Sequence, residues 1–267
     1  MTLDFARNSP LRTLTMAALI GLTVSARAQL VDPSKPKPQD TTGAMAGYDM
    51  LGVKLGMSEA DAVAAIRKRF PDGSPDAMGR PMKIKQTDYM LVNPSNRQPV
   101  RAGVRFELRP EQKSNYDFIK LLVHDGKVWA VWRDDMSSKY DYDKMVGELT
   151  TKYAAARPIE SMFDVIEGTK RTSDGSKGTS GVELYDGKCT GTPLSHMATD
   201  SIALQPGCNK VLWVNYSITK TAGVKSIGAG GGQLVDLEAG RMFFASMNNA
   251  ATAKAQSDNK RGGDAKL

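Results

Sequence analysis

FIKLLVHDGKVWAVWR, residues Phe118–Arg133, is the stretch that indicates the fold most clearly. Two apolar runs flank the pair Asp125-Gly126. An Asp-Gly pair is the preferred centre of a type I′ turn, because both central residues need positive φ. The stretch therefore predicts a two-stranded β-hairpin. Since the turn type sets the register, His124 is expected opposite Lys127, and each further cross-strand pair follows from that one.

Strict alternation along the two strands divides this hairpin into two faces. The face expected to pack on the core is apolar and carries Ile119, Leu121, Val123, Val128, Ala130 and Trp132. The other face mixes aromatic, aliphatic and cationic side chains, namely Phe118, Lys120, Leu122, His124, Lys127, Trp129, Val131 and Arg133.

The mixed face of the hairpin is the candidate binding surface. Tryptophan is a residue type that anchors interfaces. The candidate binding residues are Trp129 and its neighbours Lys120, Leu122, Lys127 and Arg133. The alternative is that the protein's own helices or a further strand cover this face.

The first 28 residues have the pattern of a secretory signal peptide. Arg7 and Arg12 form a basic region, residues 14–24 are apolar, and a small-x-small site ends at Ala28, before Gln29. The apolar run is shorter than the roughly 20 residues that span a bilayer. No cysteine for lipid attachment lies near this site. The sequence thus predicts cleavage after Ala28 and a soluble periplasmic or secreted protein without a transmembrane segment.

Composition limits the classes of partner. About 240 residues remain after cleavage, enough for one large domain or two small ones. The whole chain carries a formal net charge of +7, and its basic residues are interspersed with acidic ones. This pattern argues against a nucleic-acid partner. A protein or an anionic envelope component is the partner class that the charge favours, and no pattern indicates a cofactor.

Two cysteines, Cys189 and Cys208, are the only ones in the chain. In an exported protein they predict a disulfide that closes a loop of about 20 residues and contributes about 3 kcal/mol. The alternatives are a zinc site or a nucleophilic cysteine, each served by His196. Two cysteines and one histidine do not supply four zinc ligands, and no CxxC or HxxxH spacing is present, so the disulfide is favoured.

Two helices have clear capping signals. Ser58 is expected to cap a helix over Glu59–Phe70, and Asp141 a second helix over Tyr142–Ala156. The alanine-rich residues 238–257 are also predicted to be helical, with a strand continued through Phe244 as the alternative. Strands are expected at Met82–Val92, Val100–Leu108, Met162–Ile166, Val182–Tyr185, Val211–Ile218 and Gln233–Leu237 as well as in the hairpin.

These elements predict an α+β fold, with two or three helices packed on an antiparallel sheet, because short connections favour antiparallel pairing. The domain is expected over residues 47–257. The order helix, strands, Asp-Gly turn occurs twice, with the second turn at Asp186-Gly187. Two loosely related halves, 47–136 and 137–257, are therefore an alternative to an undivided domain. The spacing of caps and turns differs between the halves.

Three further segments are predicted to lack regular structure. The proline-bearing residues 29–46 are expected to form a disordered or extended tether, and residues 258–267 a disordered tail. A Gly/Ser/Lys-rich stretch over 168–181 is expected to be a loop.

Residues Val53–Val63, VKLGMSEADAV, carry a resemblance. They are similar to the short strand, Gly-Met-Ser/Thr and helix opening of the superfamily that contains small outer-membrane-assembly lipoproteins and the β-lactamase inhibitory protein. The resemblance implies a helical segment packed on an antiparallel sheet and action through protein contacts rather than catalysis. The chain departs from the family pattern, since Ala62 replaces the usual Val, Arg67 replaces the usual Gly and the lipid-anchor cysteine is absent.

No nucleophile, base and orienting group can be assembled from the sequence. Asp134 and Asp135 are adjacent in a strand and point to opposite faces. The run Gly228–Gly232 lacks the Lys-Ser/Thr of a phosphate-binding loop and is interpreted as a flexible linker. The sequence thus predicts a non-enzymatic protein- or surface-interaction module without a metal site. The alternative is a periplasmic or secreted hydrolase whose residues are distant in sequence.

Overall fold

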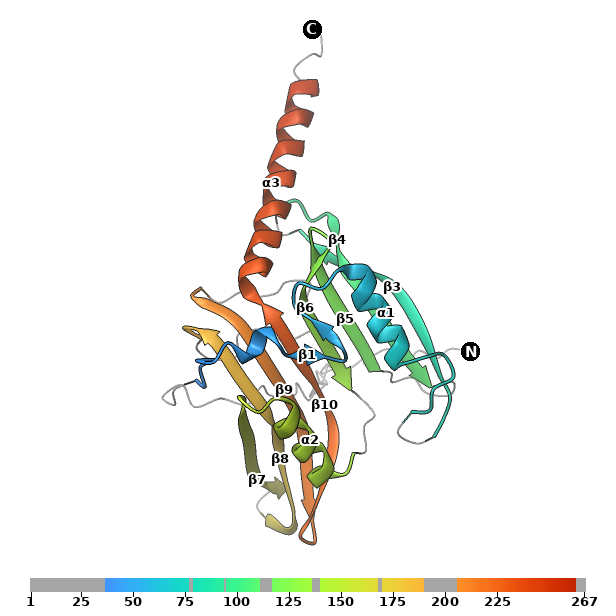
Figure 1. The fold of residues 1–267 in the computed structure, drawn as a ribbon, viewed down its shortest axis with the longest axis vertical. Coiled ribbons are helices and arrows are strands. Elements are labelled where there is room, and N and C mark those ends of the chain that lie inside the picture. Colours follow the sequence, from blue (N-terminus) through green and yellow to red (C-terminus); the bar gives the residue numbers. More distant parts are fainter. Residues whose placement is uncertain are drawn as a thin grey trace, which may run out of the picture. The chain divides into compact units, whose positions relative to one another are not determined.

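The computed structural model describes residues 37–76, 79–93, 95–110, 117–135, 140–167, 170–189 and 206–262. Within these ranges the chain forms an eight-stranded antiparallel sheet, a two-stranded sheet and three α-helices (Figure 1). The predicted α+β class is confirmed. The predicted signal peptide and His196 lie outside the described residues.

The elements follow one another in two similar series. In chain order they are η1 (Ala44–Ala46), β1 (Asp49–Met50), β2 (Val53–Lys54), α1 (Glu59–Arg69), β3 (Met82–Val92), β4 (Pro99–Pro110), β5 (Asp117–His124), β6 (Lys127–Asp135), α2 (Tyr142–Lys152), β7 (Arg157–Glu167), β8 (Lys170–Gly187), β9 (Cys208–Thr221), β10 (Val224–Asp236) and α3 (Leu237–Gly262). The large sheet has the order β3-β4-β5-β6-β10-β9-β8-β7. Two four-stranded meanders, each preceded by a helix, therefore join through β6 and β10.

The hairpin of β5 and β6 begins as predicted. Asp125 and Gly126 have φ values of 48° and 71°, as a type I′ turn requires, and His124 pairs with Lys127. The register then shifts, because Leu122 pairs with Ala130. Trp129 is therefore the extra residue of a β-bulge.

The bulge reverses the predicted faces of the rest of β6. Val131 packs in one core cluster with Leu121, whereas Ala130 packs in a second cluster with Leu122. Trp132 lies across from Lys120, and the faces predicted for these residues of β6 were wrong. Arg133, expected beside Lys120, instead faces the side of the sheet that α2 covers.

Helices α1 and α2 pack on one face of the sheet, and both predicted caps are confirmed. Ser58 Oγ accepts a hydrogen bond from the Asp61 N–H at 3.1 Å, and Asp141 Oδ1 accepts one from the Lys144 N–H at 2.8 Å. Helix α2 ends at Lys152, earlier than predicted. Apolar side chains of both helices belong to the larger core cluster.

The two meanders repeat the same contact between a helix cap and a strand. Ser58 bridges Lys127, which follows the Asp125-Gly126 turn, and Asp141 bridges Ser226, which follows a turn at Ala222-Gly223. In the second meander, the equivalent positive-φ turn is therefore the one at 222–223, between β9 and β10. Asp186 and Gly187, predicted to be that turn, end β8 and pair with β9. The halves thus share their order of elements.

Two glycine-rich stretches that were predicted to be irregular are strands. Residues 170–181 belong to β8, and the run Gly228–Gly232 belongs to β10. Their glycines lie where neighbouring backbones approach closely. A Cβ on Gly181 would lie 1.8 Å from the Val214 carbonyl oxygen, and one on Gly230 would lie 2.4 Å from that of Asn215. Crowding, rather than flexibility, accounts for these glycines.

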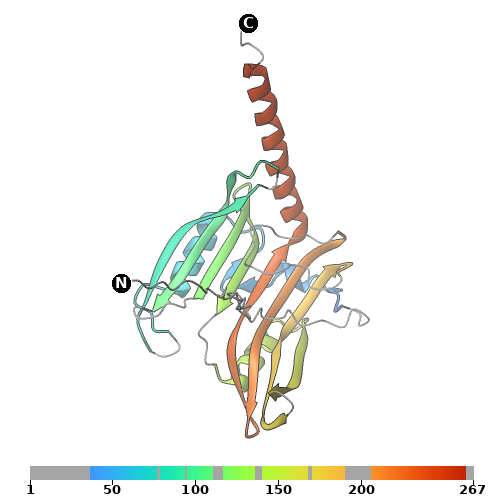
Figure 2. The ribbon, with the colours of Figure 1, turned by 180° about the vertical axis from the view of Figure 1, so that it is seen from behind.

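Leu237, Phe243 and Met247, in the first turns of helix α3, belong to the second core cluster. In Figure 2, α3 continues from the end of β10. The Trp129 side chain is buried, and its ring lies 6.0 Å from that of Phe243. The helical prediction for 238–257 is confirmed. Residues 258–262 of the expected disordered tail also belong to α3, and 263–267 lie outside the described residues.

None of the helices in the described ranges combines the length and apolar character that a membrane crossing requires.

The described part of the expected tether, residues 37–46, is ordered instead. The Tyr185 N–H donates to the Pro38 carbonyl at 2.9 Å, and the Asp40 N–H donates to the Tyr185 carbonyl at 2.8 Å. Met45 is buried in the larger core cluster. Backbone pairing with β8 and the burial of Met45 are the physical reasons for this difference.

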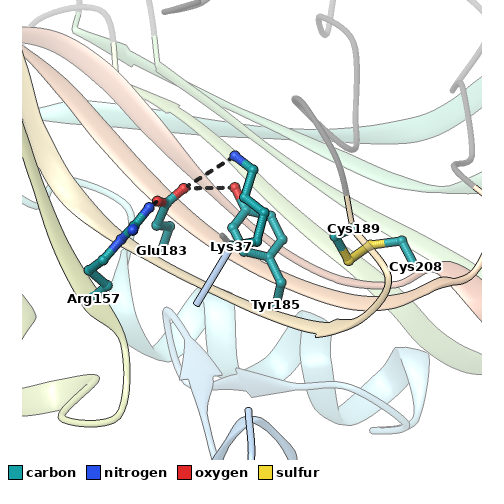
Figure 3. A network of polar contacts seen from close by, with 6 residues as sticks. All are labelled: Lys37, Arg157, Glu183, Tyr185, Cys189 and Cys208. Carbon is teal, nitrogen blue, oxygen red and sulfur yellow. Dashed lines mark hydrogen bonds and ion pairs between the residues drawn. A yellow bond between two sulfur atoms is a disulfide. The ribbon is translucent and has the colours of Figure 1, made fainter. Parts of the chain in front are cut away.

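The segment that pairs with β8 also closes a polar network (Figure 3). The buried Glu183 carboxylate forms ion pairs with Arg157 and, at 3.9 Å, with Lys37, and accepts a hydrogen bond from the Tyr185 hydroxyl at 2.9 Å. These contacts satisfy a charge inside the fold. We assign the network a structural role.

The predicted disulfide between Cys189 and Cys208 is confirmed. It joins the end of β8 to the start of β9, and both cysteines are buried in the second core cluster. Arg241 of α3 donates a hydrogen bond from Nη1 to the Cys208 carbonyl at 3.0 Å. The disulfide thus lies under the base of α3.

Candidate functional site

A pocket of about 440 Å³ lies between α2 and the junction of the two meanders. Its lining residues are Met50, Leu51, Arg69, Arg133, Tyr140, Asp141, Lys144, Met145, Glu148, Leu149, Lys152, Tyr153, Val214, Tyr216 and Gly232. Strands β6, β10 and β9 form the floor, and α2 contributes one wall along its whole length. We refer to this cavity as the junction pocket.

Two cross-strand rows run beneath the junction pocket, and Arg133, Gly232, Val214 and Tyr216 of these rows line it. One contains Arg133, Gly232 and Val214, and the other contains Asp135, Gly230 and Tyr216. The central residue of each row is a glycine, so the middle strand places no side chain there. A Cβ on Gly232 would lie 2.8 Å from Met50 Cε. The absent side chains leave room for the larger ones on either side.

A buried ion pair lies at the floor. Arg133 Nη2 donates to Asp135 Oδ2 at 2.7 Å and to the Tyr140 hydroxyl at 3.0 Å, and this hydroxyl donates to Asp135 Oδ2 at 3.1 Å. Burial opposes the charged form of Arg133, but Asp135, Tyr216 and Tyr140 together outweigh it and raise the pKa of the guanidinium. Arg133 is therefore a permanent cation.

Three tyrosines supply neutral hydroxyl groups. Burial raises the pKa of Tyr216 to about 12 and also raises those of Tyr140 and Tyr153. The Tyr153 hydroxyl donates to the Asp49 carbonyl at 2.8 Å. Because these hydroxyl groups remain protonated at neutral pH, they serve as hydrogen-bond donors.

The rim of the junction pocket carries more basic than acidic side chains. Its cations are Arg69, Lys144 and Lys152, and its acids are Asp141 and Glu148. The Asp141 carboxylate caps α2, and Lys152 pairs with Asp49 at 2.8 Å. With Arg133 below, four basic and two acidic side chains line the pocket, and two of the four basic ones pair with Asp135 and Asp49, which are not part of the lining.

The remaining lining is apolar. Met50, Leu51, Met145, Leu149 and Val214 form most of this surface. A concave apolar surface with a few convergent polar groups is typical of small-molecule sites. Across the described ranges, no group of three or more His, Cys, Asp or Glu side chains has an arrangement that would hold a metal ion.

The structure does not bring the five predicted binding residues together on one surface. Trp129 and Leu122 are buried in the core cluster that α3 covers. Lys120 is also buried, with its Nζ 4.6 Å from the centre of the Tyr89 ring. Lys127 is exposed beside the turn, and Arg133 faces the junction pocket.

Sequence reasoning missed most of the junction pocket. Arg133 was a candidate, but on the wrong face, and Tyr140 and Tyr216 have no local pattern that relates them. One signal was available. Gly230 and Gly232 are two residues apart in β10, and Arg133 and Asp135 are two residues apart in β6, so each pair lies on one face of its strand. Alternating glycines opposite an ion pair are a pattern that indicates a hollow on one face.

Comparisons of the chain with models of known families, with curated proteins and with solved structures found no match.

Proposed function

We propose that this chain is an exported, non-enzymatic binding protein whose junction pocket takes a small molecule. One observation carries this proposal, namely a pocket of about 440 Å³ with a glycine floor, apolar walls and a single buried cation. Pockets of a few hundred Å³ with this kind of lining are typical ligand sites. Strands of both meanders and helix α2 supply its lining.

Export is supported by the pattern of residues 1–28 and by the disulfide, which forms in oxidising compartments. Mass spectrometry of protein recovered from the native cell envelope or medium tests this. We expect the mature chain to begin at Gln29. A chain that begins at Met1 would contradict export by this route.

A non-catalytic role is supported by the resemblance of residues 53–63 to the superfamily of assembly lipoproteins and the β-lactamase inhibitory protein. The sequence placed the contact surface on the hairpin around Trp129. Because that side chain lies under α3, we assign the binding role to the junction pocket instead.

The fluorescence of anilinonaphthalene sulfonate, an aromatic anion that emits strongly in apolar sites, tests the proposal. We expect a saturable increase in emission with the wild-type protein. Leu149→Trp should abolish it, because the larger ring fills the pocket from α2. Thr151→Trp is the matched control, since Thr151 is exposed on the same helix and does not line the pocket. Equal emission from both variants would refute the proposal.

A further inference from the structure

The ion pair at the floor of the junction pocket is asymmetric. Arg133 lines the pocket with 16% of its side chain exposed, whereas the Asp135 side chain is only 1% exposed. An occupant of the pocket therefore meets the cation of this pair and not its anion. Tyr140 and Arg133 together cover the Asp135 carboxylate.

The Arg133 guanidinium also has unused hydrogen-bonding capacity. Nη2 makes the contacts with Asp135 and Tyr140. Nε is buried and has no acceptor among the described residues. A guanidinium has five N–H donors, and buried donors without acceptors cost stability. Nε itself is shielded, so a ligand oxygen would meet the exposed part of the Arg133 side chain instead.

The walls determine the rest of the occupant. Apolar side chains from β1, α2 and β9 surround the space above Arg133, among them Met50, Leu149 and Val214. Burial of an apolar body against them is favourable. At the rim, Lys144 and Arg69 add positive charge beside Glu148. The chemistry of the lining is therefore amphipathic.

We infer that the junction pocket binds a small amphipathic anion, with a carboxylate-type head group on Arg133 and an apolar body against α2 and β9. This inference rests on the proposed function and specifies its ligand. Charge-assisted contacts between a guanidinium and a carboxylate are stronger than contacts between neutral groups. A neutral molecule of the same length should therefore bind less tightly.

Titration calorimetry with octanoate and octanol tests the inference, because the two probes differ only in the head group. The wild-type protein should bind octanoate at least tenfold more tightly than octanol. The double variant Arg133→Gln/Asp135→Asn replaces the ion pair with two amides. It should lose this preference while its affinity for octanol stays within about threefold of the wild-type value.

The control variant Lys127→Gln removes an exposed cation far along β6 from the pocket and should keep the preference for octanoate. Equal affinities of the wild-type protein for both probes would overturn the anion inference and leave the proposed function standing. Binding of neither probe would also overturn it, and the Leu149→Trp fluorescence experiment then decides the proposed function separately. The comparison of probes on the wild-type protein holds even if the double variant does not fold.

Discussion

Trp129 is the bulged residue of β6, and its large side chain lies in the core under α3. Its ring is 6.0 Å from that of Phe243 and 6.4 Å from that of Phe244. A Cβ on Gly240 would lie 2.8 Å from it, so the helix approaches as closely as glycine allows. The bulge in β6 therefore places the Trp129 ring where α3 packs on it.

Trp129→Ala should lower the free energy of unfolding by about 3–5 kcal/mol, because it removes a buried aromatic side chain and leaves a cavity. Urea denaturation measures this loss. Trp213→Ala is the matched control, since Trp213 is only partly buried and should cost less. A loss below about 1 kcal/mol for Trp129→Ala would contradict its place in the core.

Asp134 lies on the face of β6 opposite Arg133, and burial raises its pKa to about 7. Lys120 and Arg105 lower this pKa, while Asp117 and Asp135 raise it further. An unfolded aspartate has a pKa of about 3.9. Ionisation of the native side chain is therefore unfavourable, and stability falls as pH rises from about 4 to about 7.

Asp134→Asn removes this penalty, so the variant should gain stability relative to the wild type at pH 8 and gain little or none at pH 4. Urea denaturation at both pH values measures the difference. Asp143→Asn, at an exposed position near the start of α2, should show no such dependence. An Asp134→Asn effect that is the same at both pH values would contradict the burial of this carboxyl group.

The helices α1 and α2 occupy equivalent places in the two meanders, but α2 forms a wall of the junction pocket, whereas α1 contributes only Arg69 at its rim. Ser58→Ala and Asp141→Ala each remove an N-cap and should each cost about 1 kcal/mol in urea denaturation. Asp141→Ala should also change the emission of bound anilinonaphthalene sulfonate, because Asp141 lines the pocket, whereas Ser58→Ala should not. Identical emission from the two variants would show that the start of α2 does not shape the pocket.

Much of this arrangement of elements could be predicted from local signals. The Asp125-Gly126 turn and the caps at Ser58 and Asp141 depend on residues that are near in sequence, and all three were predicted. The bulge at Trp129 could not be predicted, because the alternation of β6 is equally regular with or without it. The glycines of β8 and β10 were interpreted as loops, since the crowding that requires them arises only when the strands pair.

The same reasons explain the incomplete prediction of the site. Arg133 was selected for its residue type, but the bulge decides which face it occupies. Tyr140 and Tyr216 meet it only because β6, β9 and β10 lie together at the junction of the meanders. Such a site depends on the tertiary fold rather than on a local motif.

At the scale of the whole molecule, the disulfide ties the second meander to α3 through Cys208 and Arg241. Cys189→Ser/Cys208→Ser should lower the free energy of unfolding by about 3 kcal/mol. Without the disulfide, the unfolded chain regains the conformational entropy that the closed loop takes away. Urea denaturation with and without reductant measures it. Reductant should destabilise the wild type and leave the double variant unchanged, and an unaffected wild type would contradict this role.

The central claim is that the junction of the two meanders forms the binding site. Amide chemical shifts of the isotope-labelled protein, titrated with octanoate, test this claim most directly. We predict that the largest changes occur at Gly230, Gly232 and Tyr216, around the floor of the pocket. Changes confined to α3, for example at Phe243, or no saturable change at all, would contradict it.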